Sequence, residues 1–145
     1  MYARMPEPIQ LVRILVVEDF EPFRRYVCAT LQARPEWRII GEASDGLEAV
    51  HKAEELRPDL ILLDIGLPTM DGIEAAKRIS TLVPGAKVLF VSQQKNADVV
   101  AAALSNGAKG YVLKANAGRE LMPAVEAVLE GRRFVGSGVM QRPPE

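Results

Sequence analysis

The chain has 145 residues, of which 48% are hydrophobic and 26% charged, with a formal net charge of −1. This length and composition fit one globular domain and exclude the strongly basic surface of a nucleic-acid-binding protein. A single cysteine, Cys28, excludes an internal disulfide and favours a cytoplasmic location. No apolar run approaches the ~20 residues of a membrane span, so we expect no membrane contact.

Residues 1–12 precede the first strand signal and lack the long apolar core of a secretory signal. We therefore expect a short lead-in over residues 1–12, one folded domain over residues 13–131 and a tail over residues 132–145. The tail contains Gly136-Ser137-Gly138 and Pro143-Pro144, a composition typical of a flexible extension or the start of a linker.

Five short apolar runs bounded by turn residues predict buried strands over residues 13–19, 37–43, 60–63, 86–92 and 109–114. After each run, apolar residues recur at helical spacing. Phe23, Val27 and Leu31 form the first such face, and Asp45 or Ser44 is suited to cap the second helix. Strict alternation of strand and helix predicts an α/β fold, with a parallel sheet covered by helices on both faces.

Residues 59–72 carry the clearest functional signal. Asp64 follows four consecutive aliphatic residues, and Gly66, Pro68 and Gly72 break the chain directly after it. Open parallel sheets bind ligands outside the carboxyl ends of their strands, so Asp64 lies where such sheets perform their chemistry. Taken alone, the segment is explained equally well if Asp64 only starts a turn.

Other predicted strands bring polar side chains to the same edge. The first strand ends in Glu18 and Asp19, the fourth in Ser92 and the fifth in Lys114. Three carboxylates in one crevice repel one another, and a hard divalent cation removes this conflict. Oxygen ligands favour Mg²⁺ over zinc or copper, and Lys114 adds a positive charge for Asp64 or for an oxyanion attached to it. Taken alone, Glu18 and Asp19 would be better explained as a cap of the first helix.

Together these residues predict a phosphoryl-accepting site. Asp64 would be the nucleophile, Lys114 and Mg²⁺ would neutralise the phosphoryl oxygens, and Ser92 would hydrogen-bond one of them. We expect the metal ligands to come from the ends of the first and third strands: Glu18, Asp19, Asp64 and, through its backbone carbonyl, Gly66.

In order and spacing, these segments resemble the receiver domain of bacterial two-component response regulators, over about residues 13–131. The resemblance rests on the acidic pair at 18–19, the segments at 64–72 and 107–114, and Ser92. It implies a flavodoxin-like (βα)5 fold, with a doubly wound parallel five-stranded sheet in the order 2-1-3-4-5. The segments at 107–114 and 130–135 are most similar to the NarL/LuxR-type branch.

The resemblance also implies a function. A partner histidine kinase would donate a phosphoryl group to Asp64, and the chain would be a phosphorylation-dependent signalling switch rather than a turnover enzyme. The conformational change would control a homodimer or an output domain, in transcription regulation. Members of this branch usually bind DNA through a C-terminal helix-turn-helix, which this chain does not show.

Family positions add further expectations. Ser92 and Tyr111 would form the switch pair, while Gly66 and Gln94 would flank the attacking water and tune the lifetime of the phosphorylated state. Many receivers have proline where this chain has Ala115. The isomer of the peptide bond before Ala115 therefore stays open, because a cis bond to a non-proline residue costs roughly 2.5–4 kcal/mol.

The sequence leaves three alternatives to compare with this function. A degenerate receiver would serve only protein contacts, but the intact Asp19, Asp64, Ser92 and Lys114 argue against it. A small phosphohydrolase of the haloacid dehalogenase type would need a second aspartate where Gly66 stands. A flavodoxin-like or cobalamin-binding domain would need a phosphate loop or an Asp-x-His-x-x-Gly pattern, and neither occurs.

Overall fold

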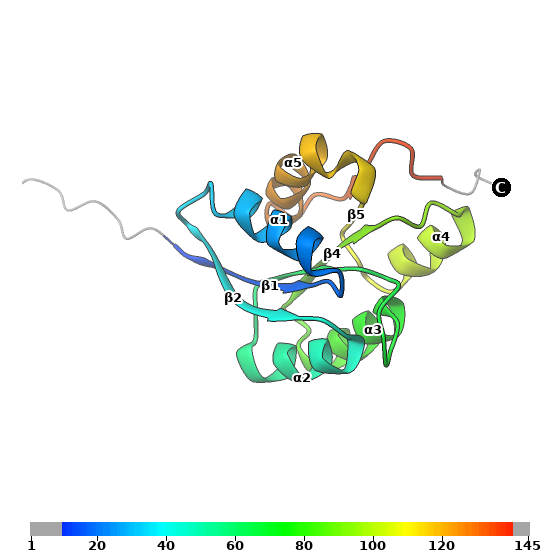
Figure 1. The fold of residues 1–145 in the computed structure, drawn as a ribbon. Helices are drawn as coiled ribbons and strands as arrows, with labels where there is room; N and C mark the ends of the chain where they lie inside the picture. Colours follow the sequence, from blue (N-terminus) through cyan, green and yellow to red (C-terminus); the bar gives the residue numbers. More distant parts are fainter. Residues whose placement is uncertain (1–9, 141–145) are drawn as a thin grey trace, which may run out of the picture.

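The computed structural model describes residues 10–140. It contains one six-stranded parallel sheet in the order β2-β1-β3-β4-β5-β6, with helices on both faces (Figure 1). Most of the predicted lead-in, residues 1–9, and the end of the predicted tail, residues 141–145, lie outside the described residues.

The strands are β1 (Val12–Val17), β2 (Trp37–Ala43), β3 (Leu60–Leu63), β4 (Lys87–Ser92), β5 (Gly110–Leu113) and β6 (Phe134–Val135). The helices are α1 (Glu21–Leu31), α2 (Gly46–Leu56), α3 (Gly72–Leu82), α4 (Ala97–Ser105) and α5 (Ala117–Leu129), with a short 3-10 helix, η1 (Lys114–Asn116), before α5. No helix in this part of the chain is both long and apolar enough to cross a membrane.

The predicted α/β class and the strand order 2-1-3-4-5 are confirmed. The prediction of five strands is corrected by β6, which pairs parallel to β5 and joins Phe134 to Gly110 and Val135 to Tyr111. These residues were predicted to lie in a tail, because two residues followed by Gly136 give no strand pattern. Folded structure therefore extends past residue 131, where the predicted domain ended.

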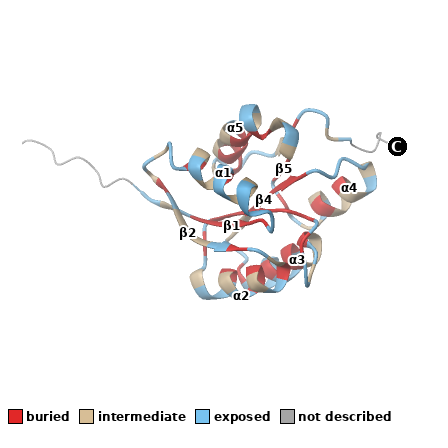
Figure 2. Ribbon diagram, in the orientation of Figure 1, coloured by how far each residue is buried: buried red, intermediate tan, exposed pale blue. Residues whose placement is uncertain are grey.

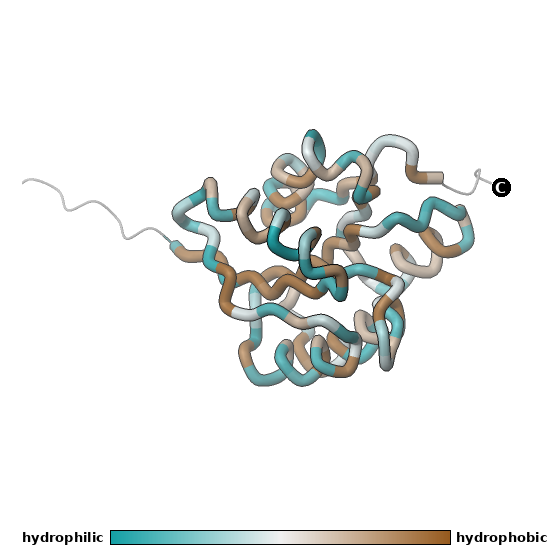
Figure 3. The backbone as a smooth tube through the Cα atoms, viewed as in Figure 1, coloured by the Kyte–Doolittle hydropathy of each residue, from teal (hydrophilic) through white to brown (hydrophobic). Residues whose placement is uncertain are grey.

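The sheet separates two apolar layers. One layer lies between the sheet and α2, α3 and α4, and the other lies between the sheet and α1 and α5. Figure 2 shows the central strands buried between the helices, and Figure 3 shows these strands as mostly hydrophobic. Because helices cover both faces, β3 is buried along its whole length, which explains its unbroken aliphatic run.

The helices begin at the carboxyl edge of the sheet, and side chains cap three of them. Asp45 accepts the backbone N–H of Glu48 at the start of α2, which selects it over Ser44 as the cap. Asp71 caps α3 and Asn96 caps α4 in the same manner. A side-chain cap satisfies one of the free N–H groups of a first helical turn and contributes about 1 kcal/mol. These caps fix the loops that surround the strand ends.

Candidate functional site

The ends of β1 and β3 bring the predicted acidic residues together. These strands are neighbours, with Val17 paired to Leu63, so the residues after them emerge side by side. Carboxylate oxygens of Glu18, Asp19 and Asp64 all lie within 4.8 Å of one another. The sequence-based expectation that this edge gathers three carboxylates agrees with the structure.

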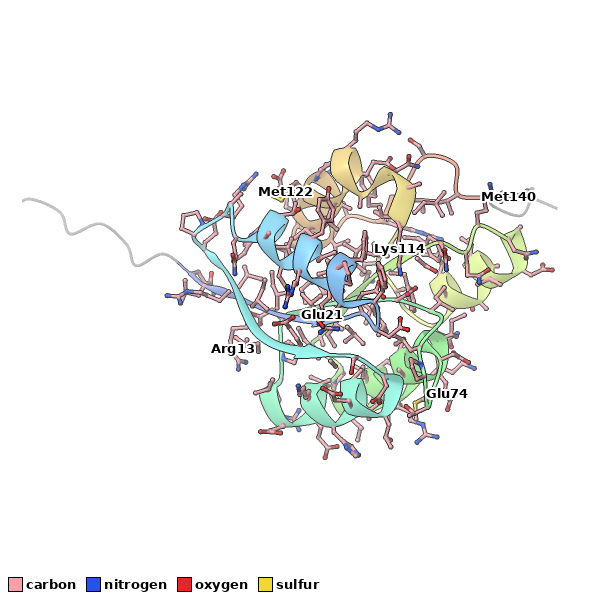
Figure 4. All side chains as sticks on the ribbon, viewed as in Figure 1. Arg13, Glu21, Glu74, Lys114, Met122 and Met140 are labelled. Atoms are coloured by element: carbon pink, nitrogen blue, oxygen red, sulfur yellow. The ribbon has the colours of Figure 1, made fainter. Side chains whose placement is uncertain are left out.

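Lys114 links two of these carboxylates. It follows β5 directly, and its Nζ lies 2.6 Å from Oε1 of Glu18 and 2.9 Å from Oδ2 of Asp64. Its side chain, labelled in Figure 4, is only 19% exposed. The ammonium also lies 5.0 Å from the ring centre of Phe23 on α1, close enough for a cation–π contact. Lys114 thus pairs with both acidic strand ends at once.

Burial and pairing set the protonation of this cluster. Burial raises the pKa of Glu18, and the negative charge of Asp64 raises it further, although hydrogen bonds from Lys114 and from the N–H of Phe20 oppose the shift. Burial lowers the pKa of Lys114, but its hydrogen bonds to Glu18 and Asp64 outweigh burial and leave that pKa above its ordinary value. Lys114 therefore stays charged at neutral pH.

The Asp64 carboxylate is oriented by its surroundings. Its Oδ1 accepts the N–H of Ile65 at 2.7 Å, while Oδ2 faces Lys114. The N–H of Asp64 donates to the carbonyl of Val17 at 3.2 Å, which extends the pairing of β1 and β3 past the last strand residue. Asp64 is 5% exposed, whereas Asp19 is exposed beside it. The site therefore has a buried acceptor carboxylate and an open acidic flank.

A cleft of about 480 Å³ opens above these groups. Its lining comes from four strand ends and the start of α1: Asp19, Phe20, Phe23, Asp64, Gly66, Ser92, Gln93, Gln94 and Lys114. The structure thus brings Gly66 and Gln94 to the cleft, as the sequence analysis expected. The sequence pattern did not indicate Phe20 at this cleft. Phe23 was predicted only on the apolar face of α1, but this position borders both the core and the cleft.

Ser92 and Tyr111 meet through one residue, Gln94. The fully buried Ser92 accepts the N–H of Gln94 at 3.1 Å, and the Tyr111 hydroxyl donates to the carbonyl of Gln94 at 2.6 Å. Burial raises the pKa of Tyr111, and the charge of Asp64 raises it further, although a hydrogen bond between the Ser92 and Tyr111 hydroxyls lowers it. The Gln94 side chain itself is exposed.

The bond between Lys114 and Ala115 is trans, as are the other peptide bonds among residues 10–140. This resolves the isomer that the sequence left open.

The donor set fits a hard divalent cation. All three side chains offer carboxylate oxygens, and three carboxylates against one ammonium leave the cluster with excess negative charge. Oxygen ligands of this kind suit Mg²⁺.

Residues 14–126 match the response regulator receiver domain family. This match covers most of the chain, and the chain belongs to that family. Receiver domains are signalling modules, so the prediction that the chain is not a turnover enzyme is confirmed, as is the proposed similarity to the NarL/LuxR-type branch.

Three related proteins illustrate the match. The transcriptional regulatory protein LiaR of Bacillus subtilis is 38% identical over 129 residues, which is 89% of this chain and 61% of LiaR. LnrK of the same organism is 36% identical over 135 residues, which is 93% of this chain and 58% of LnrK. A crystal structure of a LuxR-family response regulator from Aurantimonas sp. SI85-9A1 superposes with a TM-score of 0.85 at 32% identity, covering 90% of this chain and 93% of that one. The chain thus spans about 60% of the length of these two curated relatives.

Proposed function

We propose that Asp64 accepts a phosphoryl group from a partner histidine kinase in a Mg²⁺-dependent reaction, and that the product controls a homodimer or an output domain. The observation that carries the proposal is the Lys114 ammonium, which pairs with Asp64 beside two further carboxylates in an open cleft. A purely structural ion pair would not need the third carboxylate, Asp19, to be exposed at the cleft.

In this reaction a carboxylate oxygen of Asp64 forms a bond to phosphorus while the bond between phosphorus and the donor nitrogen breaks. Lys114 keeps the carboxylate in place and offers its ammonium protons to the phosphoryl oxygens as charge builds on them. Glu18, Asp19, Asp64 and the carbonyl of Gly66 would hold Mg²⁺, which would neutralise the phosphoryl oxygens. The exposed flank at Asp19 leaves the cleft accessible to the donor.

We assign the switch to Ser92 and Tyr111. The Ser92 hydroxyl accepts the Gln94 N–H and lies against the Tyr111 hydroxyl, and we propose that its proton turns to a phosphoryl oxygen on Asp64 after phosphorylation. Movement of Ser92 toward that oxygen would pull on Gln94, whose carbonyl holds the Tyr111 hydroxyl. Phosphorylation would thereby shift the population between two packings of residues 92–94 against β5.

Gly66 and Gln94 are proposed to set the lifetime of the phosphorylated state. Both line the cleft that contains Asp64. Gly66 has no side chain to block or hold a water molecule, whereas the amide of Gln94 can orient one but cannot act as a base near neutral pH. Hydrolysis would then depend on how Gln94 positions the water.

The relatives are transcriptional regulators, and we propose the same kind of output for the protein that contains this chain. DNA binding would belong to a C-terminal helix-turn-helix domain, as in the LuxR-type branch, and not to residues 10–140. The net charge of −1 agrees with this division.

The proposal is tested by incubating the chain with acetyl phosphate and measuring its intact mass. We expect one added phosphoryl group with Mg²⁺, none after chelation, and none in Asp64→Asn. A chain that gains nothing with Mg²⁺ would instead support the degenerate receiver that serves only protein contacts. Steady release of phosphate over many turnovers would support the phosphohydrolase.

A further inference from the structure

Arg24 lies on α1 and joins the acidic turn to the neighbouring strand β2. Its Nη1 donates to the backbone carbonyl of Glu18 at 2.8 Å, and its Nε donates to Oε1 of Glu42 at 3.1 Å. Only 18% of the Arg24 side chain is exposed. The guanidinium thus spans two elements that border the site without entering the cleft itself.

The Glu18 carbonyl belongs to the peptide group that joins Glu18 to Asp19. A peptide group is planar, so a partner that fixes its carbonyl also fixes the direction in which Asp19 leaves β1. In the part of the chain that the structure describes, the Asp19 side chain has no hydrogen bond or ion pair of its own. Its position therefore depends on the backbone of this turn.

We propose that Arg24, anchored by Glu42, is a positioning residue that holds the peptide between Glu18 and Asp19 so that both carboxylates face the metal. The inference rests on the proposed Mg²⁺ site. Because Glu42 lies within hydrogen-bonding distance of Arg24, its charge offsets that of the guanidinium. Arg24 can therefore hold the turn at residues 18–19 while adding little repulsion toward a bound Mg²⁺.

The neighbouring arginine provides a matched control. Arg25 lies on the same helix, its side chain is 78% exposed, and it pairs with Glu21. Arg24→Met and Arg25→Met each remove one positive charge while keeping a long unbranched side chain. By charge alone, both variants should bind Mg²⁺ more tightly than the wild type does. If Arg24 positions the turn, Arg24→Met should instead bind it about tenfold more weakly, the loss expected for one charge-assisted hydrogen bond.

The measurement is calorimetric titration of the metal-free chain with MgCl₂ alone. We expect the dissociation constant of Arg25→Met to stay within about twofold of the wild type, as for other exposed surface charges. Arg24→Lys should fall between the wild type and Arg24→Met, because an ammonium can donate to the Glu18 carbonyl but cannot reproduce the planar fork. Glu42→Gln should also weaken binding, since a neutral amide anchors the guanidinium less firmly than a carboxylate does.

Thermal unfolding with and without Mg²⁺ provides an independent readout, because at a given concentration a tighter-binding ligand raises the unfolding temperature more. A smaller Mg²⁺-induced rise in Arg24→Met than in Arg25→Met supports the inference. If Arg24→Met does not fold, Arg24→Lys and Glu42→Gln decide the question by the same measurements. Equal or tighter Mg²⁺ binding in the folded Arg24 and Glu42 variants would overturn the inference. A wild-type chain that binds no Mg²⁺ would overturn the proposed metal site itself.

Discussion

The two acidic loops of the site are held in place by different means. The loop after β1, residues 18–20, depends on side chains: the Glu18 carboxylate accepts the N–H of Phe20, and Arg24 holds the Glu18 carbonyl. The longer loop after β3, residues 64–71, depends mainly on backbone contacts. The N–H of Gly72 donates to the carbonyl of Ile65 at 2.7 Å, and the N–H of Gly46 donates to that of Pro68 at 3.1 Å.

The difference matches the role proposed for each loop. The β3 loop carries the acceptor Asp64, and its backbone packs so closely that a Cβ on Gly72 would lie 1.9 Å from the carbonyl oxygen of Asp64. Thr69 also links this loop to α2, because its hydroxyl donates to the Asp45 carboxylate at 3.0 Å. The Thr69 backbone has a φ of 66°. The β1 loop contains no glycine, and its Glu18 is held instead by Arg24 and Lys114.

Gly72→Ala tests the tight packing of the β3 loop and should have the largest effect on stability. The new methyl group cannot fit beside the Asp64 carbonyl unless the loop shifts, so we expect the free energy of unfolding to fall by about 3 kcal/mol. Gly66→Ala is the control on the same loop, since a Cβ there meets nothing within 4 Å. Urea denaturation measures both. Equal losses in the two variants would contradict the packing argument.

Lys114→Met breaks the link between the two loops. It leaves Glu18 and Asp64 buried without their shared cation, and we expect a loss of about 2 kcal/mol at neutral pH in the absence of metal. The exposed Lys109→Met is the matched control and should change stability by less than about 0.5 kcal/mol. Adding Glu18→Gln to Lys114→Met should recover part of the loss, because one unpaired carboxylate is removed. Strictly additive losses would argue against the shared ion pair.

The sequence predicted the strand order and the convergence of the site well, since both follow from local patterns and from the rule that parallel strands end at one edge. The bounds of β2, residues 37–43, were predicted as observed. Contacts that depend on how two elements pack against each other were not predictable. The bond from Arg24 to the Glu18 carbonyl depends on how α1 crosses β1, and β6 forms only because β5 offers an unpaired edge. The place of Phe20 in the cleft likewise depends on the path of the turn.

The smallest expected effect is the pH dependence of stability that Asp45 contributes. The backbone N–H of Glu48 holds the pKa of Asp45 below its ordinary value, and Thr69 and Leu47 contribute in the same direction. A lowered pKa in the folded state stabilises the protein fully above the unfolded-state pKa, and this stabilisation is lost as the pH falls through the folded-state pKa. We therefore expect wild type to lose stability relative to Asp45→Asn only below about pH 4. A constant difference between the two proteins from pH 7 to pH 2.5 would contradict the assignment.

The central claim is that Asp64, in the β3 loop, is the phosphoacceptor and that the carboxylates of the β1 loop hold the metal for its phosphorylation. The most direct measurement is to phosphorylate the chain with acetyl phosphate and Mg²⁺, reduce the acyl phosphate with borohydride and map the modified aspartate by peptide mass spectrometry. The account predicts homoserine at position 64 and unmodified aspartate at Asp19, Asp59 and Asp71. Modification at Asp19, or at Asp71 with Asp64 intact, would contradict it.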